Sequence, residues 1–179
     1  MKILLGVSGS IAATLAPKIA RAFSDKGIGL SWIFTKAASN ICIKNVSLFD
    51  SVELDEFQHY KDTGEVLHIS LRREYDAFVI APLSANTLAK VSNGLCDSVL
   101  TNVARCWDYD KPMILVPAMN TMMWHNPITA RQLNIMKDLG ATVVDPVYKT
   151  LACGDTGIGA MAHINDIVKE VENQCLASH

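Results

Sequence analysis

A series of short apolar segments, each followed within a few residues by a polar side chain and then by a helical pattern, constrains the fold of this chain most. Residues 2–7, 77–81 and 113–116 are such segments. Apart from Lys2 they are apolar throughout, whereas a strand with one solvated face alternates between apolar and polar residues. Continuous apolar strands that alternate with helices are typical of a parallel sheet covered on both faces. The sequence therefore predicts an α/β fold with a doubly wound parallel sheet in a three-layer α/β/α sandwich.

Length and composition predict a single domain over residues 1–179 that needs no disulfides. A chain of this length buries roughly 70% of its unfolded surface, and the sequence contains no internal repeat or low-complexity linker. The five cysteines are scattered, without CxxC or metal-ligand spacing. We therefore expect free thiols, a reducing compartment and no bound metal.

The net charge of −2 gives no electrostatic reason to expect binding to nucleic acid or to a membrane. The sequence has neither an apolar span long enough for a membrane helix nor the residue order of a signal peptide. We therefore expect a cytoplasmic protein in which helix N-termini or single basic residues hold any anionic ligand.

The loops at the carboxyl ends of the predicted strands carry the candidate ligand-binding residues, because open α/β sheets bind ligands at that edge. Gly9 and Ser10 follow the first strand and precede a helical pattern in which Pro17 should kink the helix or shift its start. Small residues at such a loop let the backbone approach a phosphate. The spacing is not GxGxxG, and an ordinary strand-to-helix turn explains this stretch equally well.

Thr35 and Lys36 follow the second predicted strand, residues 28–34, where a dinucleotide-binding fold usually has an acidic residue for the adenosine ribose. A hydroxyl and a lysine there favour a mononucleotide phosphate such as that of FMN, although a solvated side chain in a loop is the better explanation for Lys36 itself. After the third predicted strand, Ser84 is a suitable N-cap. Small or hydrogen-bonding residues follow it at Ala85, Asn86 and Thr87.

Asn120 lies in the loop PAMNTMMW, residues 117–124, between a buried strand and the helix start at Asn126-Pro127. Its amide offers donors and an acceptor, and the neighbouring methionines and Trp124 could exclude water. A polar group in an apolar cup suits a small ligand with a carboxylate or an amide. The alternative is a connecting loop whose apolar residues belong to the core.

The rest of the chain has weaker patterns. Residues 40–64 are predicted to be irregular, with an acidic patch at 53–56 on a solvated face, and residues 65–75 to form a short helix that carries His68. Residues 148–162 contain several glycines and no periodicity, which favours a mobile flap over a site.

Together, GSIAA (9–13), LHISLRREYDAFVIAPLSANTLAK (67–90), PAMNTMMW (117–124) and ACGDTGIGAMA (152–162) resemble the flavin-containing cysteine decarboxylases over nearly the whole chain. The last two motifs, in this order and spacing, are highly specific for that family. The resemblance implies a flavodoxin-like fold and a homotrimer with FMN bound between subunits. It also implies the branch that converts 4′-phosphopantothenoylcysteine to 4′-phosphopantetheine in coenzyme A synthesis.

The resemblance also assigns roles to residues. The implied catalytic residues are His68, Asn120 and Cys153. The implied FMN contacts are Gly9, Ser10, Ile11, Thr35, Lys36, Ser84, Ala85, Asn86, Thr87 and Ala118. The implied substrate contacts are Asn120, Thr150, Ala152 and Met161. Thr150 replaces a basic residue of a plant member and Lys149 lies next to it, so the contact to the substrate phosphate stays open.

The chemistry explains why such residues are needed. Loss of CO₂ requires an electron sink that a cysteinyl carboxylate lacks, so a cofactor must supply it by transient oxidation of the thiol side. Asn120 would orient the carboxylate, and His68, kept neutral by the dipole of a helix start, would act in the oxidation. Cys153 would donate a proton during the final reduction, because an ordinary thiol is protonated at neutral pH. A nearby Asp155 would favour the neutral thiol further.

Other functions on a similar fold remain alternatives. A non-catalytic FMN-binding regulatory subunit that inhibits a phosphatase often lacks one of the catalytic residues and carries a long acidic tail, which this sequence does not show. A flavin prenyltransferase lacks the PAMN and ACGD segments as a set. A flavodoxin-like electron carrier would not need His68, Asn120 and Cys153. Peptidyl-cysteine decarboxylases share the first half of this reaction, the oxidation and the loss of CO₂. The ACGD segment with its cysteine favours the full reaction, in which the oxidised product is reduced again.

Overall fold

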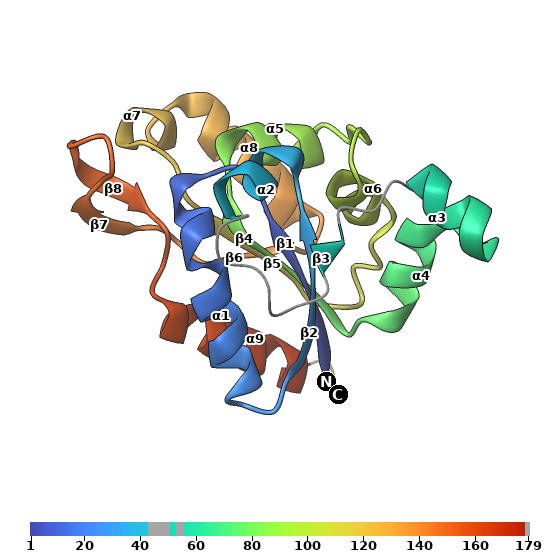
Figure 1. The fold of residues 1–179 in the computed structure, drawn as a ribbon. Helices are drawn as coiled ribbons and strands as arrows, with labels where there is room; N and C mark the ends of the chain where they lie inside the picture. Colours follow the sequence, from blue (N-terminus) through green and yellow to red (C-terminus); the bar gives the residue numbers. More distant parts are fainter. Residues whose placement is uncertain (43–50, 53–55, 178–179) are drawn as a thin grey trace.

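The structure, a computed structural model, describes residues 1–42, 51–52 and 56–177. Within these residues a six-stranded parallel sheet in the order β3-β2-β1-β4-β5-β6 forms the centre of the molecule (Figure 1). Its strands are β1 (Lys2–Val7), β2 (Gly29–Phe34), β3 (Ser51–Val52), β4 (Ala77–Leu83), β5 (Met113–Pro117) and β6 (Thr142–Val143). Every neighbouring pair is parallel. The predicted parallel, doubly wound sheet is therefore confirmed.

Helices cover both faces of this sheet. They are η1 (Ile11–Leu15), α1 (Ala16–Ser24), α2 (Lys36–Cys42), α3 (Glu56–Thr63), α4 (Leu67–Glu74), α5 (Ala85–Ser92), α6 (Val99–Cys106), α7 (Thr121–Trp124), α8 (Pro127–Asp138) and α9 (Ile164–Ala177). Side chains alternate between the two faces of a strand. Ile3 and Leu5 of β1 therefore pack with α1, α2 and α9, whereas Leu4 packs with α5, α6 and α8. Apolar residues on both faces explain why the strands show no polar alternation.

Pro17 shifts the start of the first α-helix, as expected from the sequence. Residues Ile11–Leu15 form a 3-10 turn, and the α-helix begins at Ala16 with Pro17 in its first turn. Proline fits there because the first turn of a helix needs no hydrogen bond from its N–H. The predicted N-caps are also confirmed, since Ser84 accepts a hydrogen bond from the Thr87 N–H and Asn126 accepts one from the Ile128 N–H.

The prediction that residues 40–64 are irregular is wrong for the part that the structure describes. Helix α2 extends to Cys42, and α3 covers Glu56–Thr63. No residue of α3 is buried, so the sequence offers no apolar stripe by which this helix could be recognised. Most of the predicted acidic patch, residues 53–55, lies outside the described residues.

The segment predicted to be an aperiodic flap is a β-hairpin. Strands β7 (Val147–Thr150) and β8 (Thr156–Ala160) pair antiparallel, and Gly154 adopts φ +92° in the turn between them. The hairpin is separate from the main sheet and lies beside α7 at one end of the molecule (Figure 1). Among the described residues, no helix is both long enough and apolar enough to cross a membrane.

Candidate active site

The loops after β1, β2, β4 and β5 lie at one edge of the sheet because these strands are parallel. The buried Ser8 hydroxyl connects two of these loops. It donates to the Pro82 carbonyl at 2.7 Å and accepts from the Ser84 N–H at 2.7 Å. This pair of bonds fixes the start of α5 beside the end of β1. The loops that the sequence assigns to a flavin are thus neighbours in space.

Small residues and helix starts make this edge suitable for a phosphate-bearing cofactor. A Cβ added to Gly9 would lie 2.5 Å from the Ala37 Cβ, so only glycine lets the loop after β1 approach α2 this closely. Thr35 and Ser84 use their hydroxyls to accept from the first-turn N–H groups of α2 and α5. Helix starts supply N–H donors and a positive dipole to anions. The loops that carry Gly9, Thr35 and Ser84 therefore suit the phosphate and ring system of FMN. Of the other predicted contacts at this edge, Lys36 and Asn86 are exposed, Ala85 is half-buried and Thr87 is buried.

A cavity of about 770 Å³ lies next to this edge, between η1, α1, the Asn120 loop, the hairpin and the start of α9. Its size is in the range of small-molecule sites, about 300–1,000 Å³. Several predicted site residues from distant parts of the chain line it together: Ser10, Ile11, Ala118, Asn120, Thr150, Ala152, Cys153 and Met161. The predicted cofactor loop and the predicted substrate residues therefore share one cavity.

Asn120, Cys153 and Asp155 form a hydrogen-bonded group at the mouth of this cavity. The Asn120 side-chain oxygen caps α7 by accepting from the Met122 N–H at 2.8 Å. The Asn120 Nδ2 donates to Asp155 Oδ2 at 2.8 Å and to Cys153 Sγ at 3.3 Å. The Cys153 thiol lies 3.4 Å from the same Asp155 oxygen. The helix cap fixes the amide so that its donors point at the hairpin, where Asp155 lies close to the thiol.

Glycines in β8 hold the hairpin against the Asn120 loop. The Met119 N–H donates to the Gly159 carbonyl at 3.0 Å. A Cβ on Gly159 would lie 2.2 Å from the Met119 carbonyl oxygen, and one on Gly157 would lie 2.5 Å from Thr121 Oγ1. Glycines at these two positions therefore allow the close contact that brings Cys153 to Asn120. Glycine spacing alone does not reveal such a packing partner, so this role of the two glycines could not be predicted from the sequence.

We predict that Gly159→Ala lowers the free energy of unfolding by about 2–6 kcal/mol. Backbone strain at φ +142° contributes about 1–3 kcal/mol, and the clash with Met119 adds about 1–3 kcal/mol. Gly154→Ala is the matched control, since its φ is +92° but a Cβ there meets nothing within 4 Å. Urea unfolding measures both variants, and equal destabilisation would contradict the packing role of Gly159.

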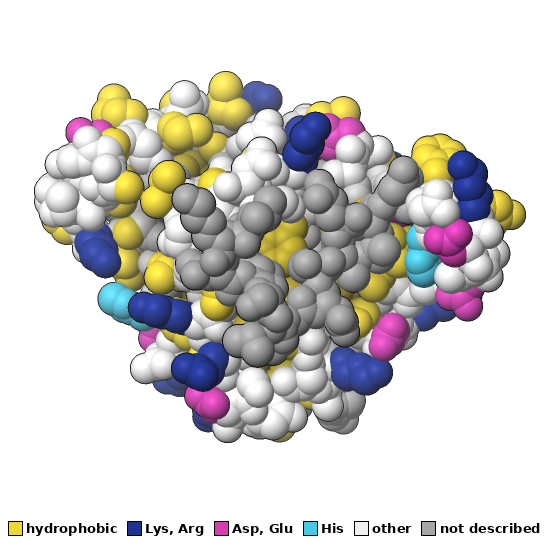
Figure 2. Space-filling view, viewed as in Figure 1, with side chains coloured by type: hydrophobic (Ala, Val, Ile, Leu, Met, Phe, Trp, Pro, Cys, Tyr) yellow, Lys and Arg dark blue, Asp and Glu magenta, His cyan; other side chains and the backbone are white. Residues whose placement is uncertain are grey.

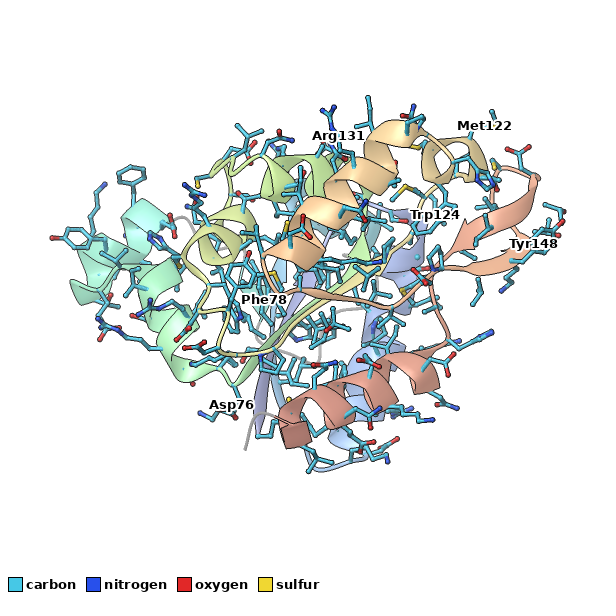
Figure 3. The ribbon with its side chains drawn as sticks, turned by 180° about the vertical axis from the view of Figure 1, so that it is seen from behind. Asp76, Phe78, Met122, Trp124, Arg131 and Tyr148 are labelled. Carbon is cyan, nitrogen blue, oxygen red and sulfur yellow. The ribbon has the colours of Figure 1, made fainter. Side chains whose placement is uncertain are left out.

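The apolar cup predicted around Asn120 is only partly correct. Ala118 and Met119 line the cavity, but Met122 and Met123 are 76% and 48% exposed and do not line it. Helix α7 turns these side chains outward while Trp124 packs against the core on the side of α8. Figure 3 shows Met122 on α7 and Tyr148 on the hairpin at the same end of the molecule.

His68 is the predicted catalytic residue that does not line the cavity. It lies in the first turn of α4, and α4 is at the opposite end of the molecule from the hairpin (Figure 1). Its Nδ1 is 2.6 Å from Glu56 Oε1, and Glu56 Oε2 accepts from Asn102 Nδ2 at 2.6 Å. Glu56 is thus half-buried in a hydrogen-bonded group, not on the solvated face that the sequence analysis expected. Sequence reasoning missed it because nothing in the sequence marks which acidic residue will meet His68.

The cysteines are all free, as predicted. Cys42 and Cys175 are buried, whereas Cys153 is exposed at the cavity. Burial raises the pKa of the Cys42, Cys106 and Cys175 thiols, which makes them poor nucleophiles and poor metal ligands. No group of metal-ligating side chains occurs among the residues that the structure describes.

Comparison with known proteins agrees with this geometry. A family model described as "Flavoprotein" matches residues 1–176. The chain belongs to the flavoprotein family. This flavoprotein is 46% identical over 179 residues to a phosphopantothenoylcysteine decarboxylase of Oryza sativa subsp. japonica, in an alignment that covers 97% of this chain and 80% of the rice protein. The relationship confirms the resemblance that the motifs indicated.

Solved structures extend the likeness of this flavoprotein to three dimensions. A PPC decarboxylase with a Cys-to-Ser substitution, complexed with pantothenoylaminoethenethiol, superposes with a TM-score of 0.90 at 41% identity, covering 96% of both chains. The FMN binding protein AtHal3 superposes with a TM-score of 0.86 at 41% identity, covering 96% of this chain and 95% of its own. The flavodoxin-like α/β sandwich is therefore confirmed.

Proposed function

We propose that this chain is an FMN-dependent decarboxylase that converts 4′-phosphopantothenoylcysteine to 4′-phosphopantetheine. The observation that carries the proposal is the cavity in which the Asn120 amide donates to the Cys153 thiol at 3.3 Å, in a chain whose relatives are named for this reaction. A carboxylate-binding amide beside a proton donor is the arrangement that decarboxylation followed by reduction requires.

FMN would be held by the loops after β1, β2, β4 and β5, with its phosphate near the helix starts. The proposed contacts are Gly9, Ser10, Ile11, Thr35, Lys36, Ser84, Ala85, Asn86, Thr87 and Ala118. Bound there, FMN supplies a reversible two-electron oxidation of the thiol side of the substrate, which creates the electron sink for CO₂ loss.

Asn120 binds the substrate carboxylate in this proposal. The amide donors that now reach Asp155 and Cys153 would turn to the carboxylate, while its oxygen continues to cap α7. Once CO₂ has left, the enethiolate carbon needs a proton as it is reduced. Cys153 gives that proton, and solvent at the cavity mouth restores the thiol. Thr150, Ala152 and Met161 would contact the rest of the substrate along the cavity wall.

His68 would reach this chemistry from a neighbouring subunit. Within one chain α4 and the hairpin lie at opposite ends (Figure 1), so His68 and Cys153 meet only if copies of the chain associate. Exposed apolar side chains favour such an interface, among them Ile11, Met122 and Tyr148 at 65%, 76% and 73% exposure. We propose a homotrimer of single-domain chains with FMN between subunits.

The phosphate of the substrate would bind at the basic residues of the cavity. These are Lys18 of α1, Lys149 of β7 and His163 before α9, all of which line it. Figure 2 shows Lys or Arg side chains beside a His side chain on this face, between the hairpin and α1. The salt bridges found among the described residues involve neither Lys18 nor Lys149. Both ammonium groups are therefore available to an anion.

We predict that the double variant Lys18→Ala/Lys149→Ala raises the KM for phosphopantothenoylcysteine by about 10-fold, since each partly exposed ion pair contributes up to about 1 kcal/mol. The KM for the unphosphorylated pantothenoylcysteine should stay within about two-fold. Lys169→Ala, which removes an exposed lysine of α9 outside the cavity, is the control. An equal rise for both substrates would place the phosphate elsewhere.

The proposed function is tested on the purified protein. We expect a yellow protein with a flavin absorbance spectrum that releases CO₂ from phosphopantothenoylcysteine and forms 4′-phosphopantetheine. A protein that takes up no FMN would overturn the proposal. A yellow protein that forms no product even when trimeric would favour the regulatory alternative, in which a related fold binds FMN without catalysis.

A further inference from the structure

Glu56 of α3 and His68 of α4 make a short, partly buried polar contact. Glu56 Oε1 lies 2.6 Å from His68 Nδ1, and the two side chains are only 24% and 27% exposed. Partial burial reduces solvent screening of the pair. Glu56 is also the first residue of α3, where the helix dipole stabilises a negative charge.

Asn102 fixes the other oxygen of this carboxylate. Its Nδ2 donates to Glu56 Oε2 at 2.6 Å, and it lies on α6, whose start is held by the capping box of Ser98 and Thr101. Helix α6 also contacts the backbone next to the imidazole, because the Cys106 thiol donates to the His68 carbonyl at 3.6 Å. The carboxylate and the ring are thus positioned from the same helix.

The hydrogen-bonding capacity of these groups sets the tautomer of His68. An ionised carboxylate can only accept hydrogen bonds, so Nδ1 must carry the proton that joins it to Glu56. In the neutral ring Nε2 is then left with a free lone pair. A neutral histidine with Nε2 unprotonated is the form that can take a proton from a substrate.

We propose that Glu56 is the positioning residue of His68 and holds it in the Nδ1-protonated tautomer that the oxidation half-reaction needs. The proposal rests on the proposed function. In that step Nε2 of His68 would take the thiol proton of the substrate, and FMN held at the site would supply the acceptor for the hydrogen on the adjacent carbon and its electron pair. The Glu56 carboxylate then stabilises the positive charge on the ring, as the aspartate does in a Ser-His-Asp triad.

Glu56→Gln gives a sharp test because Asn102 dictates how the new amide points. Asn102 Nδ2 can donate only to the glutamine oxygen, so the glutamine NH₂ faces Nδ1 and His68 must shift its proton to Nε2. We expect kcat to fall at least about 100-fold with KM within about two-fold, because the equivalent change in a Ser-His-Asp triad lowers kcat about 10⁴-fold. Glu56→Ala leaves the tautomers free to exchange and should be more active than Glu56→Gln.

The double variant Glu56→Gln/Asn102→Asp exchanges the two groups and should restore most of the activity. The glutamine NH₂ would then donate to the new carboxylate, and its oxygen would accept from Nδ1 as Glu56 does. Glu65→Gln is the matched control, since Glu65 lies just before α4 and accepts from Ser70 rather than from His68. It should change kcat less than about two-fold, as expected for a surface substitution.

Nitrogen-15 NMR of the imidazole rings provides a readout that does not depend on catalysis. We expect His68, assigned from the signal lost in His68→Asn, to be Nδ1-protonated in the wild type, Nε2-protonated in Glu56→Gln and Nδ1-protonated in the double variant. Full activity of Glu56→Gln, or a wild-type ring protonated at Nε2, would overturn the inference. An inactive wild type would overturn the proposed function instead, and the NMR result would still decide whether Glu56 sets the tautomer.

Discussion

Cys153→Ser is expected to release CO₂ from phosphopantothenoylcysteine but to stop at the oxidised, decarboxylated product. In the proposed mechanism, loss of CO₂ depends on the carboxylate site at Asn120 and on the electron sink, and neither step uses the thiol proton. The later reduction needs a proton, and a serine hydroxyl is a far weaker acid than a thiol. We expect formation of 4′-phosphopantetheine to fall at least about 100-fold, since general acid catalysis contributes about 10²–10⁴-fold.

Mass spectrometry of the products distinguishes the two outcomes of this experiment, because the enethiol is two hydrogens lighter than the final thiol. A decarboxylase relative with a Cys-to-Ser substitution has been solved with pantothenoylaminoethenethiol, an enethiol of this type. Cys96→Ser, at another exposed cysteine that does not line the cavity, should behave as the wild type. If Cys153→Ser formed 4′-phosphopantetheine at the wild-type rate, the Cys153 thiol would not be the proton donor.

Asn120→Asp is expected to lower kcat/KM for decarboxylation by at least about 100-fold. The amide donor to the substrate carboxylate is lost, and one hydrogen bond to a charged group is worth about 1.5–3 kcal/mol, or about 10- to 150-fold. The new carboxylate would also face Asp155, whose oxygen is now 2.8 Å from the Asn120 nitrogen, and it would repel the substrate. The helix cap survives, because the aspartate oxygen can still accept from the Met122 N–H.

Asn126→Asp separates the loss of this donor from any effect on helix capping. Asn126 caps α8 in the same way, accepting from the Ile128 N–H at 2.9 Å, and does not line the cavity. Asparagine and aspartate are about equally good N-caps, so the control should keep its activity and its melting temperature. Steady-state kinetics and thermal unfolding test both variants. Similar losses of activity in the two would argue that capping, not substrate binding, explains the effect.

The candidate site divides into a part that local sequence could predict and a part that it could not. The strand-end loops with Gly9, Ser84 and Asn120 could be predicted, because an apolar strand followed by a capping residue is a pattern within a few adjacent residues. The match of the segments at residues 67–90 and 152–162 to a known family added His68 and Cys153. The role of Gly157 and Gly159 could not be predicted, because it depends on how closely β8 approaches Met119 and Thr121.

The sequence by itself determined the parallel sheet, the alternation of strands and helices outside residues 40–64 and 148–162, and the edge at which ligand-binding loops gather. Those features follow from the periodicity of apolar residues and from helix caps, which act over short distances in the chain. Only the tertiary structure decided that a hairpin carries Cys153 to Asn120, that Glu56 holds His68, and that His68 lies at the other end of the molecule. Each of these depends on contacts between residues far apart in sequence, and such contacts are fixed by packing, which no local pattern encodes.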